Sequence, residues 1–354
     1  MQTPNVVIIG GGFSGLLIAH LLQKQRFAPK ILEARNRLGG RIHTLRKDNE
    51  PPIEMGATWL GKKHHHLLDL LDHLGIDICQ QYMGNKGYYE PMSISPPQLV
   101  DLPPNEEPSY RIEGGTDNII QTLEGFFDQG QIQLNQMVKT IRKTNTKLEI
   151  ETESDLFESD FVISTLPPKI LVDRIDFTPS LPDELTHIAS QTHTWMADSI
   201  KVALTFEESF WRNPDSSGTI FSNVGPVSEM YDHSTDNQYA LKGFMNNAYH
   251  AISRELRKQL VIEQLRRFYG RKVDSYQSYR ELVWKKEPFS YSNYEQPIVP
   301  HQYNGHAIFQ KAFLDKRLLI AGSETATEFP GYMDGVVESA HRTVRQLSNL
   351  FHNS

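Results

Sequence analysis

Short apolar runs alternate with helix-like segments at the beginning of the chain. Asn5 to Ile9 is a β-branched run that ends in glycines, and it predicts a buried parallel strand. Ser14 to Gln25 has the composition of a helix, and Lys30 to Leu32 predicts a second short strand. This strand-turn-helix-strand order is typical of the start of a doubly wound α/β sheet.

The later pattern predicts more elements of both kinds. Helices are expected over residues 64–75, 116–127, 253–269 and 335–350, meander strands within 131–150, and buried strands at 161–163 and 318–321. Ser199 to Phe206 alternates apolar and polar positions, which predicts a strand with one buried face. Residues 88–110 contain six prolines, so we expect an irregular loop that crosses between domains.

Length and charge limit the classes of function. A chain of 354 residues is long enough for about two domains. The formal net charge of −7 argues against a nucleic-acid partner, which would need a basic face. Cys79 is the single cysteine, so an intramolecular disulfide and a thiolate metal cluster are excluded.

Two segments could suggest other roles. Val6 to Leu22 is apolar enough to resemble a signal peptide, but no Lys or Arg precedes it and three glycines interrupt it. We therefore expect no membrane segment and a cytoplasmic protein. The run His64 to His66, with His73, is expected to be a solvated helix start without a metal ion, because no acidic or cysteine ligand has suitable spacing.

The strongest local motif is the G-x-G-x-x-G of residues 10–15. Gly10 would permit the tight turn, Gly12 the close approach of a pyrophosphate, and Gly15 the packing of helix against strand. The motif follows a strand and opens a helix, whose N-terminus favours phosphate binding. Glu33 follows near the usual spacing of about 20 residues for an acid that binds a ribose 2′-hydroxyl, which disfavours a 2′-phosphate.

A second glycine pair distinguishes the dinucleotide. The segment Leu32 to Ile42 places Gly39 and Gly40 among arginines just after the ribose acid, which suits an extended FAD molecule. This segment resembles the E-A-x-x-R-x-G-G-R stretch of the flavin-dependent amine oxidase superfamily. That superfamily includes monoamine and polyamine oxidases.

The resemblance covers most of the chain. Further similar segments are residues 54–61, 111–116 and 162–167, and the pair 321–326 with 331–335 is the most specific. The resemblance implies a Rossmann-type FAD-binding domain of the GR2 type, from residues 1–80, 111–170 and 312–354. It also implies an α+β substrate domain on an antiparallel or mixed sheet, from residues 81–110 and 171–311.

The resemblance also implies the residues around the cofactor. Those expected to bind FAD are Gly10, Gly12, Phe13, Ser14, Gly15, Glu33, Ala34, Arg35, Gly40, Arg41, Gly56, Ala57, Thr58, Val138, Thr165, Trp284, Gly322, Ser323, Glu324, Gly331, Tyr332 and Met333.

Three residues match the family's catalytic positions. Lys201 matches the lysine that holds a water beside flavin N5, and a desolvated lysine can take part in proton transfer. The alternative for Lys201 is an exposed strand lysine. Tyr332 and Tyr294 match the two rings that flank the substrate nitrogen, and the alternative for Tyr294 is ordinary packing. The implied reaction passes a hydride from an amine to flavin N5, with oxygen as acceptor, and yields an imine, then an aldehyde, and hydrogen peroxide.

Three departures from the family pattern refine this expectation. Asn293 stands where monoamine oxidases carry the flavin-linked cysteine, so FAD is expected to be bound without a covalent link. Trp59 stands where L-amino-acid oxidases carry a carboxylate-binding arginine, which argues against an amino-acid substrate. Most of the family's helical substrate lid is missing between Tyr89 and Arg111, so the pocket is open or is completed by a partner.

Two other functions stay open on the sequence. The short length also suits a renalase-like or desaturase-like oxidase of a dihydronicotinamide or another non-amine. The other alternative hypothesis is a flavin-bearing binding protein without catalytic activity. The sequence decides neither the substrate nor the oligomeric state, nor whether oxygen is the physiological acceptor.

Overall fold

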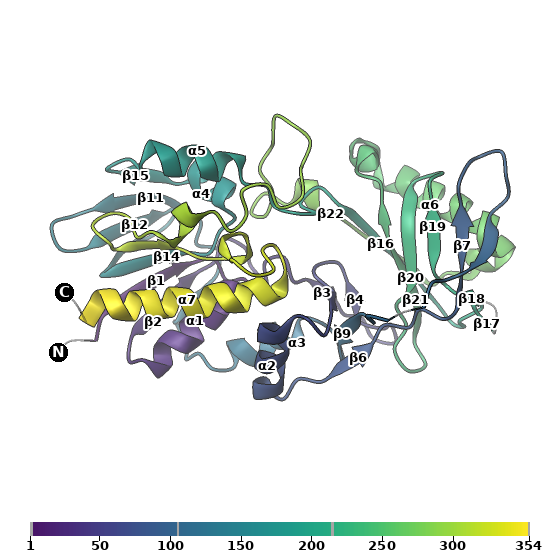
Figure 1. Cartoon of the computed structure of the whole chain (residues 1–354), viewed down its shortest axis with the longest axis horizontal. Coiled ribbons are helices and arrows are strands. Elements are labelled where there is room, and N and C mark those ends of the chain that lie inside the picture. The colour runs from purple at the N-terminus through teal and green to yellow at the C-terminus, as the bar shows by residue number, and fades with distance from the viewer. Residues whose placement is uncertain (1–2, 105, 214–215, 353–354) are drawn as a thin grey trace.

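A five-stranded parallel sheet forms one end of the molecule (Figure 1). The computed structural model describes residues 3–104, 106–213 and 216–352. The strand order is β10 (Ile132–Gln133), β2 (Ala28–Leu32), β1 (Asn5–Ile9), β14 (Phe161–Ser164) and β23 (Leu318–Ile320), with every neighbouring pair parallel. This arrangement confirms the predicted doubly wound α/β region.

Both faces of this sheet are covered. On one face lie α1 (Phe13–Lys24) and α7 (Met333–His352), flanked by α2 (His65–Leu74) and α3 (Asn118–Glu124). On the other face lie α4 (Pro168–Arg174), α5 (Asp183–Gln191) and a second sheet, in the order β13 (Leu156–Ser159), β12 (Leu148–Thr152), β11 (Val138–Lys143) and β15 (Asp176–Thr178). Side chains alternate along a strand, so β1 sends Val6 and Ile8 to the first face and Val7 and Ile9 to the second.

A seven-stranded sheet forms the other end of the molecule (Figure 1). Its order is β22 (Ser278–Val283), β16 (Ile200–Phe206), β21 (Tyr239–Met245), β20 (Val227–Asp232), β19 (Ile220–Ser222), β7 (Lys86–Glu90) and β8 (Gln98–Asp101). Only the β19–β7 pair among these neighbours is parallel, so the sheet is mixed as predicted. Helix α6 (Arg254–Tyr269) packs on one face, and the Ser253 hydroxyl caps its N-terminus by accepting from the Leu256 amide.

The remaining elements are short. The strands are β3 (Thr44–Leu45), β4 (Ile53–Glu54), β5 (Trp59–Leu60), β6 (Ile78–Gln80), β9 (Tyr110–Ile112), β17 (Arg212–Asn213) and β18 (Ser216–Ser217). The 3-10 helices are η1 (Asn247–Ala251), η2 (Gly270–Ser275), η3 (Trp284–Lys286), η4 (Ala307–Gln310) and η5 (Ser323–Thr325). The domain boundaries given above stay predictions.

Three expectations from the pattern are corrected. Residues 88–110 are not an irregular loop, because β8 pairs with β7 in a hairpin at the sheet edge. The six prolines lie in the turn between these strands or beyond β8, where they remove no ladder hydrogen bond.

Strand β16 is buried on both faces rather than one. Val202 packs with the cluster under α6, whereas Ala203 packs with Ile53 and Met55 near β4. His64 is also buried rather than solvated, since its ring accepts from the Gly61 amide and packs against Phe329. In the described part of the chain, no helix is long and apolar enough to cross a membrane.

Candidate active site

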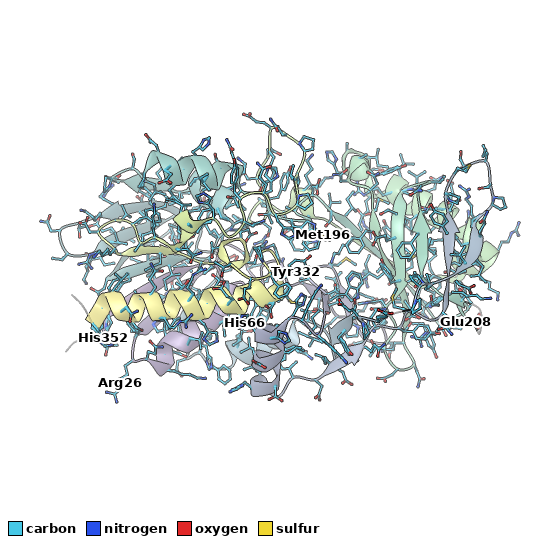
Figure 2. All side chains as sticks on the ribbon, viewed as in Figure 1. Arg26, His66, Met196, Glu208, Tyr332 and His352 are labelled. Atoms are coloured by element: carbon cyan, nitrogen blue, oxygen red, sulfur yellow. The ribbon has the colours of Figure 1, made fainter. Side chains whose placement is uncertain are left out.

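A cavity of about 350 Å³ lies where the two ends of the molecule meet. Tyr332 and Met196, which both line it, lie in this central region of the molecule (Figure 2). The predicted site residues in its lining are Gly10, Gly12, Phe13, Ser14, Glu33, Arg35, Gly40, Arg41, Gly56, Ala57, Thr58, Thr165, Lys201, Trp284, Gly322, Ser323, Gly331, Tyr332 and Met333. Four predicted cofactor residues, Gly15, Ala34, Val138 and Glu324, and the predicted cage residue Tyr294 do not line it.

The glycine turn after β1 is sterically demanding. Gly10 has φ +107°, a backbone conformation that side chains disfavour. A Cβ on Gly15 would lie 1.9 Å from the carbonyl oxygen of Gly10, so no side chain fits there. Gly15 therefore contributes to the site by letting α1 approach β1, although it does not face the cavity.

The N-terminus of α1 opens into the cavity without a side-chain cap. Its first amides have no capping side chain at Gly12, and the buried Ser14 hydroxyl has no hydrogen-bond partner in the described structure. Uncapped amides and an orphan hydroxyl beside the positive helix end suit an anionic group such as a pyrophosphate. The residues present therefore fit the phosphates of a dinucleotide.

Glu33 is fixed at the carboxyl end of β2. One carboxylate oxygen accepts from the Gly11 amide at 2.6 Å, and the other accepts from the Arg35 amide at 2.9 Å. The Arg35 guanidinium reaches the segment that follows η3, where it donates to Ser290 at 2.8 Å and to Glu287 at 3.2 Å. Glu33 is thus held beside the glycine turn by two backbone amides.

An ion pair between the half-buried Arg41 and the buried Glu324 joins the second glycine segment to the segment before α7. Arg41 donates to the two oxygens of Glu324 at 2.5 and 2.9 Å. Burial alone would raise the pKa of Glu324, but the Arg41 guanidinium outweighs it and holds that pKa below its usual value. This pair links two motifs that lie far apart in sequence.

Lys201 lies on the face of β16 that meets the cavity. Lys201 is only 6% exposed, and its ammonium donates to the Gly56 carbonyl oxygen. Burial lowers the pKa of Lys201 to about 8, although the charge of Glu54 opposes this shift. Lys201 is therefore not an exposed strand lysine, and it exchanges its proton closer to neutral pH than an ordinary lysine.

The two predicted cage tyrosines are placed differently. Tyr332 lines the cavity just before α7, and burial raises the pKa of its hydroxyl, which keeps it protonated. The Tyr294 hydroxyl instead donates to the Thr192 carbonyl and accepts from the Thr194 amide, both at 3.1 Å. The structure therefore brings Lys201 and Tyr332 into one cavity but leaves Tyr294 outside its lining.

The comparisons with known proteins agree with this architecture. The family model of flavin containing amine oxidoreductases matches residues 13–89 and 83–348. The chain belongs to this family. FAD is therefore its expected cofactor, and an oxidoreductase activity is expected of the flavin amine oxidase fold.

Individual relatives are distant but span the whole chain. A probable flavin-containing monoamine oxidase A of Dictyostelium discoideum is 24% identical, and the alignment covers 99% of this chain and 98% of the relative. Amine oxidase A of Sus scrofa is 25% identical, over 98% of this chain and 85% of the relative.

Solved structures of amine oxidases share the fold. Wild-type putrescine oxidase bound to putrescine superposes with a TM-score of 0.84 at 21% identity, covering 98% of this chain and 99% of that chain. Cyclohexylamine oxidase from Brevibacterium oxydans gives a TM-score of 0.85 at 16% identity, covering 99% and 100%.

Two residues were not predicted from the sequence: Trp195, which lines the cavity, and Lys242, which contacts the lining residues Thr58 and Trp59. Trp195 lines the cavity from an irregular segment that shows no pattern. Lys242 is 1% exposed on β21, donates to the Thr58 hydroxyl at 2.6 Å and lies 4.7 Å from the ring of Trp59. The sequence signal for Lys242 is a lysine inside the otherwise apolar run 239–245.

A second cavity of about 220 Å³ lies near Lys242, and Glu54, Arg111 and His233 are in its lining. Burial, with nearby Lys242 and Arg111, lowers the pKa of His233, so this ring is neutral at neutral pH. Among the described residues, no group of three His, Cys, Asp or Glu side chains is arranged to hold a metal ion.

Proposed function

We propose that this protein oxidises apolar monoamines with FAD bound without a covalent link. The observation that carries the proposal is that Lys201 and Tyr332 line the same cavity as the glycine turn and Glu33. A phosphate-binding end and a catalytic end are thus joined in one continuous space.

The chain's own groups would hold the cofactor along this space. The N-terminus of α1 with Ser14 would bind the pyrophosphate, and Glu33 the ribose hydroxyl. Bound FAD would supply the two-electron oxidation of the carbon that carries the amine. Asn293 is exposed, and the chain's single cysteine, Cys79, lies on β6 outside this cavity, which supports non-covalent binding.

Lys201 and Tyr332 would act on the substrate side. The Gly56 carbonyl fixes the Lys201 amine at the cavity wall, so Lys201 could hold a water or accept its proton. The Tyr332 ring offers a π face to the amine nitrogen. The work of the protein would be to bind, orient and exclude water.

The cavity wall favours a single amino group on an apolar substituent. Trp59, Trp195, Phe244 and Tyr332 contribute rings to it. Among the described residues of the lining, Glu33 is the only carboxylate, and it lies beside the glycine turn at the phosphate-binding end of the cavity. A diamine would therefore leave its second ammonium without an anionic partner, which costs binding free energy.

Part of the Dictyostelium relative's sequence has no counterpart in this chain. The alignment with the Dictyostelium relative spans 460 positions, although this chain has 354 residues, and the family match consists of two segments that overlap at residues 83–89. This supports a missing lid near β7 and a pocket more open than in the relatives. The cytoplasmic location and oxygen as acceptor stay part of the proposal.

The test is turnover by the FAD-loaded protein on three classes of compound: benzylamine, putrescine and a reduced nicotinamide dinucleotide. Hydrogen peroxide formation and reduction of a dye acceptor are followed in parallel, because the natural acceptor is open. We expect benzylamine to be oxidised best and putrescine much more slowly.

Two results would overturn the proposal. Preferred oxidation of the dihydronicotinamide would favour the non-amine oxidase. Stoichiometric FAD binding without turnover of any compound by either readout would favour a flavin-bearing binding protein.

A further inference from the structure

The segment of residues 192–197, between α5 and β16, forms one wall of the cavity. We call it the Trp195 loop. Trp195, Met196 and Ala197 all line the cavity. Met196 has φ +57°, a left-handed conformation that is unusual for a residue with a side chain. Such strained positions persist only where the surroundings hold them, and they cluster at functional sites.

The Trp195 ring faces Tyr332. The two ring centres lie 4.8 Å apart with the planes inclined at 54°. His301 contacts both rings, at 5.1 Å from Trp195 and at 5.7 Å and 18° from Tyr332. His301 does not line the cavity, so the exposed surfaces of this cluster that meet the cavity belong to Trp195 and Tyr332.

Tyr294 contacts the same loop from outside the cavity lining. Its hydroxyl bridges the backbone of Thr192 and Thr194, and its ring packs edge-on against His193 at 4.6 Å. Asn304 makes a third hydrogen bond to the loop backbone by donating to the His193 carbonyl oxygen at 3.1 Å. The first half of the Trp195 loop is thus fixed by side chains that do not reach the cavity.

We propose that Trp195, rather than Tyr294, forms with Tyr332 the aromatic wall that contacts the substrate, and that Tyr294 is a positioning residue for the Trp195 loop. This inference rests on the proposed function and narrows it. An indole presents a larger face than a phenol ring, so the wall suits amines with a flat or compact apolar substituent.

The experiment uses aniline as the probe. Aniline is an aromatic amine whose nitrogen-bearing carbon has no hydrogen, so it can bind but cannot be oxidised there. Its dissociation constant is measured on the FAD-loaded protein by NMR of the four ¹⁵N-labelled tryptophan indoles. The Trp195 signal is assigned by its loss in Trp195→Phe.

We expect the Trp195 signal to shift on titration, and Trp195→Ala to weaken aniline about tenfold, as loss of one aromatic contact implies. Trp195→Phe should weaken it less. Tyr294→Phe keeps the ring but loses the two backbone hydrogen bonds, and should weaken aniline several-fold. The matched control, Tyr303→Phe, removes a hydroxyl from a neighbouring exposed loop residue and should leave binding unchanged.

The variants separate the possible outcomes. If Tyr294 were itself a wall ring, Tyr294→Phe would bind aniline as the wild type does, which would overturn the positioning role. An unshifted Trp195 signal, or unchanged binding in folded Trp195→Ala, would overturn the wall. Two further readouts exclude a purely structural role for Trp195 and Tyr294. The variants should keep the wild-type melting temperature, and they should raise the apparent Kd for benzylamine more than they lower the limiting rate of flavin reduction.

The two proposals fail separately. Trp195-dependent aniline binding without oxidation of any amine would support the aromatic wall and contradict the proposed function. Benzylamine oxidation together with aniline binding that does not depend on Trp195 would support the proposed function and contradict the aromatic wall.

Discussion

The two ends of the cavity are built by different means. The end beside the parallel sheet is made of backbone: a glycine turn, uncapped helix amides, and a Glu33 carboxylate held by two amides. The end beside the seven-stranded sheet is made of side chains, including Lys201 on β16 and Phe244 on β21. A backbone site needs a fixed chain geometry, whereas a side-chain site needs burial and support from several elements.

The largest expected effect follows from the backbone end. In Gly15→Ala the new Cβ would lie 1.9 Å from the Gly10 carbonyl oxygen, so α1 cannot keep its place on β1. We expect little folded protein and no FAD binding, as measured by soluble yield, circular dichroism and flavin content. Gly75→Ala is the control, since Gly75 has φ +65° but no atom near its Cβ site, and should cost only about 1 kcal/mol. A Gly15→Ala protein that folds and binds FAD normally would contradict the backbone account.

The side-chain end predicts loss of rate rather than loss of fold. Lys201→Met should slow flavin reduction by benzylamine by about a hundredfold to ten-thousandfold, the range for a lost acid–base group. Rapid mixing without oxygen measures this rate, while flavin content should stay unchanged. Lys272→Met, an exposed lysine far along the same chain in η2, is the control and should react as the wild type does. An equal rate in Lys201→Met would remove Lys201 from the chemistry.

The same lysine predicts a pH-dependent cost in stability. Its pKa is lowered to about 8 in the folded protein from 10.5, so between these values the unfolded chain binds more protons. The contribution of Lys201 to wild-type stability should therefore become more favourable as the pH rises through this window. Lys201→Met lacks this contribution. The free energy of unfolding of Lys201→Met minus that of the wild type should therefore be about 3 kcal/mol larger below pH 8 than above pH 10.5.

Urea unfolding of both proteins at pH 7 and above pH 10.5 measures that difference. A stability difference that does not change with pH would mean that burial does not perturb Lys201.

The smallest effect is expected at the far edge of the seven-stranded sheet. Ile94, in the turn between β7 and β8, is 89% exposed and lies outside the cavity lining. Ile94→Ser should change the free energy of unfolding by less than about 0.5 kcal/mol and leave flavin reduction unchanged. A large loss of rate in this variant would show that the hairpin covers the site.

The same contrast explains what could be predicted from the sequence. The glycine turn and Glu33 are close in sequence, and their spacing is imposed by one strand-turn-helix-strand unit, so a local motif was enough. Trp195 meets Tyr332 only through tertiary packing, and no local spacing encodes such a contact. Tyr294 was reached by counting along an irregular segment, which gives no information on where its ring points.

The predictions of individual helices and strands were right or wrong for specific physical reasons. The expected helices over 64–75 and 253–269 are close to α2 and α6, because a glycine ends the first and a serine cap begins the second. The hairpin of β7 and β8 was not predicted because its many prolines indicated an irregular segment. The prolines lie outside the two short strands and therefore do not interrupt them. The two buried faces of β16 could not be foreseen, since Lys201 and Thr205 look like solvent-facing positions until the opposite end of the molecule covers them.

The most direct test of the account is one absorbance experiment on the FAD-loaded protein, titrated with benzylamine in the absence of oxygen. The account predicts that the oxidised flavin band is lost at one equivalent of amine oxidised per flavin. A flavin band that benzylamine leaves intact, or a folded protein that takes up no FAD, would contradict the claim that the two ends form one amine-oxidising site.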